Sequence, residues 1–136
     1  MTNKDKALAL INTFATGDTD VAKNLLAEGY IQHNTGIADG LSGLGAALEA
    51  LGKQGVQMIY DQTYQVLADG NYGLAVSEGS FGGAHTSYYD LFRVENGKIV
   101  EHWDVMETIA DESTWQNQNG KFTCDKSSVF KGLRRI

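Results

Sequence analysis

The sequence predicts an α+β domain in which three N-terminal helices pack on one face of a curved, mainly antiparallel sheet. Three observations support this fold class. Apolar residues recur at helical spacing through residues 3–53, the period changes to alternation from Met58 onwards, and an Asn-Gly pair separates the last two alternating runs. A chain of 136 residues is long enough for one domain with a substantial core.

The first helix is expected over residues 3–15, where apolar side chains stand three and four positions apart. Thr2 or Asn3 can cap its N-terminus, and Gly17 is expected to end it. A second, short helix follows and is expected to end at Gly29.

A short extended segment, residues 30–34, separates the second helix from the third. The third helix is expected over residues 41–53, and its two early glycines, Gly43 and Gly45, weaken it because glycine disfavours helix interiors. Its apolar face is formed by Leu41, Leu44, Leu48 and Leu51.

Four long strands are expected after the helices, because residues alternate between apolar and polar from Met58. They are residues 58–68, residues 71–81, and the two arms of a hairpin in residues 86–107. Gly-containing turns separate the strands, so we expect consecutive strands to pair antiparallel.

The last hairpin contains two carboxylates in unusual positions. Asp90 and Asp104 each stand between large apolar residues, although Asp is depleted in strands. A carboxylate in such surroundings must find a partner, change its protonation, or face a cavity. These two residues are therefore the first candidates for catalytic chemistry.

The register of the hairpin decides whether the two carboxylates share a face, and two registers are open. If Asn96-Gly97 forms a two-residue type I′ turn, Glu95 pairs with Lys98 and Asp90 lies opposite Trp103. The two carboxylates would then point to opposite faces.

In the second register Gly97 is a left-handed bulge residue after a type I turn, and Val94 pairs with Lys98. Asp90 then lies opposite His102, and both carboxylates point to one face. That face would hold Tyr88, Asp90, Phe92, Val100, His102 and Asp104.

The remaining candidate residues lie on the short extended segment and among the aromatic residues. His33 and Asn34 could donate hydrogen bonds to a substrate at the mouth of a pocket, although backbone groups could equally satisfy them. Four aromatic residues could line an amphipathic pocket, although such residues more often form core. They are Tyr30, Tyr64, Tyr88 and Phe92.

Composition excludes several classes of protein. A net charge of −6 argues against nucleic-acid binding, and no apolar run approaches the length of a membrane span. The single cysteine, Cys124, fits a reducing cytoplasm. We expect a domain over residues 1–122, followed by a basic C-terminal extension over residues 123–136.

No cofactor or metal is expected from the motifs. The chain has no GxSxG, no P-loop, and no GxGxxG after a strand. Three histidines and the aspartates could ligate a metal, but no HxH or HExxH spacing occurs.

Several spaced blocks of sequence resemble the SnoaL-like polyketide cyclases, which belong to the superfamily named after nuclear transport factor 2. The resemblance runs from about residue 3 to about residue 122. It is strongest to a bacterial branch described as aldol-condensing. The blocks are YIQHN at 30–34, YDLFR at 89–93, NGKIVEHWDV at 96–105 and NQNG at 117–120.

The resemblance implies a cone-shaped fold around a deep apolar pocket, and a homodimer formed through the outer face of the sheet. It also implies that Asp104 is the pocket acid/base on the last strand. The best-known cyclases have a His where this chain has Asp90, so the reaction of those cyclases does not transfer directly. Both positions face the pocket in that family, which favours the bulged register.

Together these observations lead to two hypotheses. The first is a cofactor-independent acid/base enzyme for a small to medium apolar carbonyl compound, in which Asp104 moves a proton. His33 or His102 would bind the substrate oxygen, and Asp90 would orient His102 or act as a protonated partner. The second is a non-catalytic dimeric module that binds an apolar ligand or a protein partner.

Overall fold

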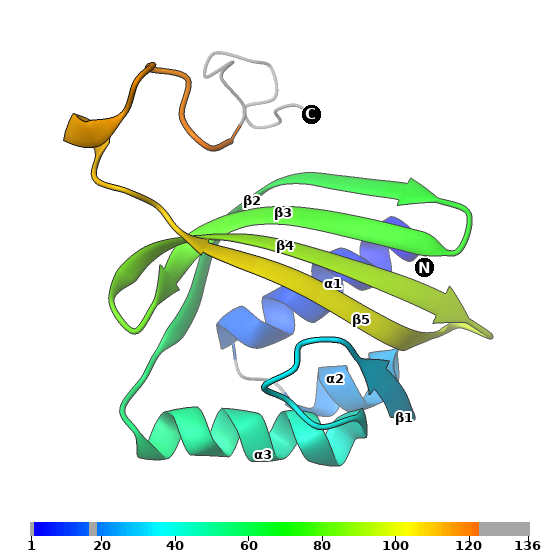
Figure 1. Ribbon diagram of the computed structural model, residues 1–136. Helices are drawn as coiled ribbons and strands as arrows, with labels where there is room; N and C mark the ends of the chain where they lie inside the picture. The colour runs from blue at the N-terminus through cyan, green and yellow to red at the C-terminus, as the bar shows by residue number, and fades with distance from the viewer. Residues whose placement is uncertain (1, 17–18, 123–136) are drawn as a thin grey trace.

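The computed structural model describes residues 2–16 and 19–122 and confirms the α+β class, with three helices on one side of a five-stranded sheet (Figure 1). The helices are α1 (Asn3–Thr16), α2 (Thr19–Leu25) and α3 (Gly40–Lys53). The strands are β1 (Leu26–Gln32), β2 (Met58–Asp69), β3 (Tyr72–Phe81), β4 (Ala84–Glu95) and β5 (Lys98–Thr108), and a 3₁₀ turn, η1 (Glu112–Thr114), follows them.

Helix α1 starts with a reciprocal cap. The Asp5 backbone N–H donates to Thr2 Oγ1 and the Thr2 N–H donates to Asp5 Oδ2, both at 3.1 Å. The cap confirms Thr2 as the N-terminal signal. The helix then buries Ala7, Leu10 and Ile11 against the sheet. Gly17, the predicted end, lies outside the described residues.

Strand β1 differs from the prediction, because Gly29 lies within the strand and does not end the second helix. The chain becomes extended at Leu26, since Leu26 and Tyr30 are both buried in the core while the backbone joins β5. β1 pairs parallel to β5, with Gln32 beside His102. The sequence predicted this extended segment but not that it joins the sheet.

The strand order across the sheet is β1-β5-β4-β3-β2, and every neighbouring pair except β1–β5 is antiparallel. The inner face of this sheet covers the helices, and the core lies between the two layers (Figure 1). None of the helices in residues 2–16 and 19–122 is long and apolar enough to cross a membrane.

The register of the β4–β5 hairpin differs from both registers considered. Asn96 and Gly97 have φ of 51° and 78°, and Glu95 pairs with Lys98, as a type I′ turn requires. The register then shifts by one residue at Val100, which is a bulge.

Beyond that bulge Asp90 lies directly opposite Asp104, and Phe92 lies opposite His102. The predicted pairing of Asp90 with His102 is therefore wrong by two positions. Asp90, His102 and Asp104 nevertheless point to one face of the sheet, as predicted. The bulge shifts the pairing of the type I′ hairpin by one residue, and a one-residue shift changes the face to which side chains point.

After β5 the chain turns back over the outer side of the sheet, away from the helices (Figure 1). Phe122 stacks on Tyr64 with ring centroids 4.7 Å apart, and the Lys121 ammonium contacts Glu107 at 2.6 Å. The predicted basic extension, residues 123–136, lies outside the described residues.

Candidate active site

A cavity of about 280 Å³ opens between α3 and the inner face of the sheet. Its wall is mostly apolar because α3 turns its leucine face towards the sheet. Polar side chains gather at the sheet end of the cavity. The apolar lining is Ile37, Leu44, Ala47, Leu48, Ala50, Leu51, Met58, Phe81 and Met106, and the polar lining is Gln32, Asn34, Tyr60, Asp90, His102 and Asp104.

Strand pairing brings the two candidate carboxylates together. Asp90 on β4 is the direct partner of Asp104 on β5, and His102 lies two residues before Asp104, so all three project from the same face. One ligand-capable atom from each lies within 4.8 Å of the others. The three residues form the centre of the site, and we call them the Asp-His-Asp cluster.

Asp90 is almost completely buried, with 1% of its surface exposed. Its Oδ1 lies 2.9 Å from His102 Nε2, and its Oδ2 accepts a hydrogen bond from the Tyr60 hydroxyl at 3.0 Å. Burial, followed by the charge and hydrogen bond of Asp90, raises the pKa of Tyr60 above its ordinary value. Tyr60 therefore remains a proton donor to this carboxyl group at physiological pH.

His102 is held from both sides. Its Nδ1 lies 2.9 Å from Gln32 Oε1, while its Nε2 faces Asp90. Phe92 stacks on the imidazole with ring centroids 4.9 Å apart. Because both nitrogens have polar partners and one face is covered, the ring has a single orientation in the cluster.

Asp104 is only partly buried, and Asn34 binds its carboxylate. Asn34 Nδ2 lies 3.1 Å from Oδ1 and 3.0 Å from Oδ2 of Asp104. The orientation of this amide is set by its own turn, because Asn34 Oδ1 accepts the backbone N–H of Gly36 at 2.9 Å. The loop after β1 thus holds the Asn34 amide so that its N–H groups point towards the carboxylate of Asp104.

The Asp-His-Asp cluster offers the kinds of ligand that divalent cations use, and it is the one such group in the described part of the chain. These residues nevertheless already have hydrogen-bond partners: Asp90 and His102 bind each other, Tyr60 binds Asp90, Gln32 binds His102, and Asn34 binds Asp104. A close group of carboxylates, imidazole, hydroxyl and amides is suited to moving protons.

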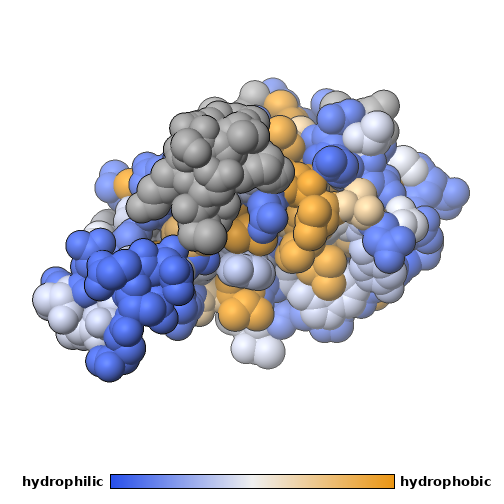
Figure 2. Space-filling model, turned by 90° about the horizontal axis from the view of Figure 1, so that it is seen from above, coloured by the Kyte–Doolittle hydropathy of each residue, from blue (hydrophilic) through white to orange (hydrophobic). Residues whose placement is uncertain are grey.

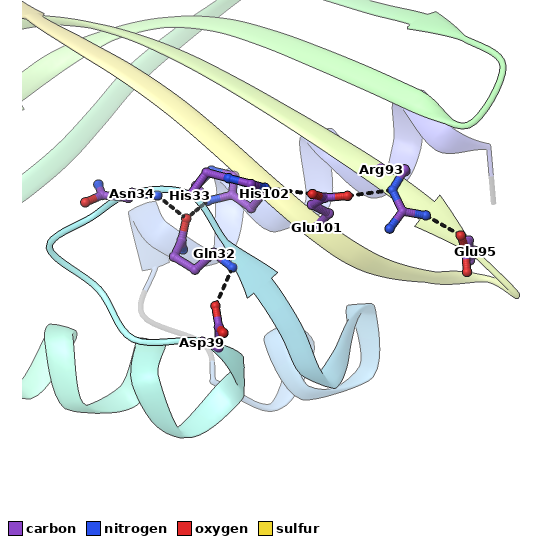
Figure 3. A network of polar contacts seen from close by, with 8 residues as sticks. All are labelled: Gln32, His33, Asn34, Asp39, Arg93, Glu95, Glu101 and His102. Carbon is purple, nitrogen blue, oxygen red and sulfur yellow. Dashed lines mark hydrogen bonds and ion pairs between the residues drawn. The ribbon is translucent and has the colours of Figure 1, made fainter.

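His33 does not reach the cavity, contrary to the prediction that it lines the mouth. Side chains alternate along the extended chain, so Gln32 and Asn34 face inward and His33 faces outward. On the outer side its Nε2 lies 2.7 Å from Glu101 Oε2 (Figure 3). Its ring stacks on Trp103, with ring centroids 4.7 Å apart. A role for His33 in binding substrate does not fit this position.

The four aromatic candidates also lie outside the cavity lining. Tyr64 is on the outer face, where its hydroxyl donates to Glu78 at 2.6 Å, because bulges in β2 change the side of the residues that follow Tyr60. The other three are core residues, each at most 2% exposed: Tyr30, Tyr88 and Phe92. Among the predicted substrate-binding residues only Asn34 lines the cavity.

Two lining residues deserve addition to the predicted site. Tyr60 and Gln32 are not among the site residues predicted from the sequence, yet both bind the Asp-His-Asp cluster. The sequence signal for Tyr60 is weak, since strand tyrosines are usually core. The sequence predicted the leucine face of α3, but it could not show that part of this face lines a cavity.

A family model described as "SnoaL-like domain" matches residues 7–102 of this chain. The matched range includes Gln32, Asn34, Asp90 and His102, and ends two residues before Asp104. None of the curated proteins matches the chain.

Solved structures with a similar fold include IdmH from Streptomyces antibioticus, a proposed polyketide cyclase. It is 19% identical, with a TM-score of 0.59 over 79% of this chain and 93% of that one. A proposed polyketide cyclase from Sinorhizobium meliloti is 16% identical, with a TM-score of 0.64 over 74% of this chain and 94% of that one.

An NTF2-like protein of unknown function from Cytophaga hutchinsonii is 18% identical, with a TM-score of 0.66. The match covers 79% of this chain and 91% of that one. At these identities the likeness to all three structures is one of fold.

Proposed function

Because the chain belongs to the SnoaL-like domain family, we propose that it is a cofactor-independent acid/base enzyme acting on a small apolar carbonyl compound. The observation that carries this proposal is the Asp-His-Asp cluster at the polar end of an otherwise apolar cavity. Positioned carboxylates and imidazole in a water-poor site are the groups that general acid/base catalysis requires.

Asp104 is the proposed base. An ionised carboxylate has about four lone-pair sites, and the Asn34 amide nitrogen occupies only part of them. Asp104 is also less buried than Asp90, so a ligand in the cavity can reach it. In the proposed step, Asp104 takes a proton from the carbon beside the carbonyl, and the C–H electron pair forms an enolate.

The Asp90–His102 pair is the proposed acid. A proton held between the two residues can neutralise the enolate oxygen, and the hydroxyl of Tyr60 supports Asp90 from the other side. Return of a proton from Asp104 to another carbon gives isomerisation. Attack of the enolate carbon on a second carbonyl gives an aldol-type ring closure. The enolate oxygen then becomes a carbonyl and returns its proton to the Asp90–His102 pair, and the new alkoxide takes the proton that Asp104 removed.

The cavity limits the size of the substrate. Its volume of about 280 Å³ lies near the lower end of the ~300–1,000 Å³ typical of ligand sites. Among the residues that the structure describes, none in its lining is a Lys or Arg that could pair with an anionic substrate. These features favour a small, largely apolar molecule whose carbonyl is directed towards the sheet.

The test uses a probe that needs no knowledge of the natural substrate. In D₂O, removal and return of an α-proton of a simple cyclic ketone, such as cyclohexanone, exchanges hydrogen for deuterium, which NMR detects. We expect the protein to accelerate this exchange, and Asp104→Asn to lower the rate by roughly 10²- to 10⁴-fold while leaving the fold intact.

Glu107→Gln is the matched control, because Glu107 is an exposed carboxylate on the same strand that binds Lys121 outside the cavity. The control should retain the wild-type exchange rate. Equal rates for wild type and Asp104→Asn would refute the role of Asp104.

A second candidate function, an apolar-ligand binding module, is favoured by one observation. Both oxygens of Asp90 and both nitrogens of His102 already have hydrogen-bond partners, as in a purely structural network. This function predicts no exchange activity, together with unchanged cyclohexanone affinity in the Asp104→Asn variant. Measuring affinity by NMR line broadening in the same samples separates the two functions.

A further inference from the structure

Gln32, the last residue of β1, is the central residue of the hydrogen-bond network behind His102 (Figure 3). Its backbone N–H donates to Asp39 Oδ1 at 2.8 Å, which ties the strand to the start of α3. Its side-chain Oε1 lies 3.0 Å from the Asn34 backbone nitrogen and 2.9 Å from His102 Nδ1. Its Nε2 donates to the Tyr30 hydroxyl oxygen at 3.2 Å.

The orientation of the Gln32 amide follows from its neighbours. A backbone N–H can only donate, so the amide atom that faces the Asn34 nitrogen must be the oxygen. The same oxygen faces His102 Nδ1. An oxygen of this kind only accepts, and therefore Nδ1 of His102 must carry a hydrogen.

A neutral imidazole has one N–H, so with Nδ1 protonated its Nε2 has only a lone pair. Yet Nε2 lies 2.9 Å from Asp90 Oδ1, inside a buried site where two acceptors without a proton would repel each other. A proton must lie on one of these two atoms. The pair thus holds either an imidazolium with a carboxylate or a neutral imidazole with a carboxylic acid.

We propose that Gln32 is a positioning residue that fixes His102 in its Nδ1–H form and thereby keeps an additional proton between His102 and Asp90. In an ordinary His–Asp pair the neutral imidazole donates its only N–H to the carboxylate, and no further proton is needed. Here the neutral imidazole would instead donate its only N–H, at Nδ1, to Gln32. The link to catalysis rests on the function proposed above, where this proton is the acid.

The test is spectroscopic and does not depend on turnover. Long-range ¹H–¹⁵N NMR of the imidazole distinguishes a protonated Nδ1 from a bare one. We expect His102 in the wild-type protein to have a protonated Nδ1. In Gln32→Met, which keeps the side-chain length but removes the acceptor, Nδ1 should lose its hydrogen, and the single N–H of a neutral ring should lie on Nε2, facing Asp90.

Two further variants complete the design. Gln32→Glu keeps an acceptor oxygen towards Nδ1 and should restore the wild-type ¹⁵N pattern. Gln65→Met removes an exposed glutamine from β2 and should change nothing at His102. In the ketone exchange assay, Gln32→Met should lower the rate by about a hundredfold, the lower end of what positioned proton transfer contributes, and Gln32→Glu should recover it.

A bare Nδ1 in the wild-type protein would overturn the proposal, and so would a protonated Nδ1 that persists in Gln32→Met. If Gln32→Met does not fold, the wild-type and Gln32→Glu spectra still decide. Absence of exchange activity in the wild type would refute the proposed function but would leave the tautomer assignment standing, so the two failures are distinguishable.

Discussion

Glu101 points away from the cavity on the outer face of β5 and joins two basic side chains (Figure 3). His33 Nε2 and Arg93 Nε both lie 2.7 Å from its carboxylate, and Arg93 also pairs with Glu95. The hydrogen bond with His33, and then that from Arg93, lowers the pKa of Glu101. This outer chain of charges holds the end of β1 beside β5.

The lowered pKa of Glu101 leads to a pH-dependent prediction. The pKa of Glu101 in the folded protein lies below its value of 4.5 in the unfolded chain. Its carboxylate therefore contributes its full stabilisation at pH values above 4.5. The stabilisation is lost as the pH falls through the folded pKa. We therefore expect the free-energy difference between wild type and Glu101→Gln to shrink on acidification from about pH 6 to about pH 3, as measured by urea unfolding.

The exposed Glu107 on the same strand supplies the comparison. Glu107→Gln should differ little from wild type, since exposed ion pairs contribute about 0–1 kcal/mol. A Glu101→Gln difference that stays constant across the acid range would show that its carboxylate is not specifically stabilised in the fold.

At the residue scale, the sequence predicted Asp90, His102, Asp104 and Asn34 as site residues, and the structure places all four in the lining of the cavity. The sequence could not place His33. Whether a histidine beside a strand end faces in or out depends on the pairing of β1 with β5, and this pairing is not encoded locally.

At the scale of single elements, helix α3 contains two glycines in contrasting surroundings. A Cβ on Gly43 would lie 1.9 Å from the backbone oxygen of Ala38, whereas a Cβ on Gly45 would meet nothing within 4 Å. Gly43 therefore allows the loop before α3 to pack closely on the helix. The sequence showed only that both glycines weaken a helix.

Alanine substitutions at the two positions should have opposite effects. Gly45→Ala should stabilise the protein by roughly 0.5–1 kcal/mol, because alanine loses less backbone entropy in a helix. Gly43→Ala should destabilise it by about 1–3 kcal/mol, as overpacking does. Chemical unfolding measures both, and a stabilising Gly43→Ala would contradict the close packing of Ala38 on α3.

The β4–β5 hairpin shows what a turn motif can and cannot predict. Asn96-Gly97 forms the type I′ turn that such a pair favours. The bulge at Val100, three residues after the turn, then moves Asp90 from Trp103 to Asp104. Nothing in the identity of Val100 marks it as a bulge, so the family resemblance predicted the shared face, and no pattern predicted the partner of each carboxylate.

At the scale of the whole molecule, we propose that two copies associate through the outer face of the sheet. Figure 2 looks onto this side and shows apolar side chains gathered there. Tyr89 and Val105 are direct partners across β4 and β5 on this face, and they are 42% and 68% exposed. Adjacent exposed apolar side chains of this kind are typical of association surfaces.

Light scattering on a size-exclusion column tests the dimer. The wild-type protein should have about twice the chain mass of 14.8 kDa, and Tyr89→Lys should shift it towards the single-chain mass by placing a charge in the interface. Leu8→Lys, on the exposed side of α1, should leave the dimer intact. A wild-type mass of one chain would refute the association.

The order of helices and strands across the molecule was predictable from the change in hydrophobic period near Met58, together with the resemblance in the spaced blocks. The cavity itself was not predictable from period alone. It depends on the contact of the loop after β1 with Asp104 on β5 and on α3 facing the sheet, and both contacts join segments far apart in the sequence.

The measurement that tests the central claim most directly is the α-proton exchange rate of the ketone probe in wild type, Asp104→Asn, Asp90→Asn and the double variant. An asparagine at position 90 can still donate to His102 and accept from Tyr60, so the fold should survive. Residues that act as one unit have non-additive effects on rate.

If base and acid belong to one proton-transfer unit, each single variant should lose most of the acceleration. The double variant should be about as slow as either one. Wild-type rates in both single variants, or losses that simply multiply in the double variant, would contradict the claim that Asp104 and the Asp90–His102 pair form a single catalytic unit.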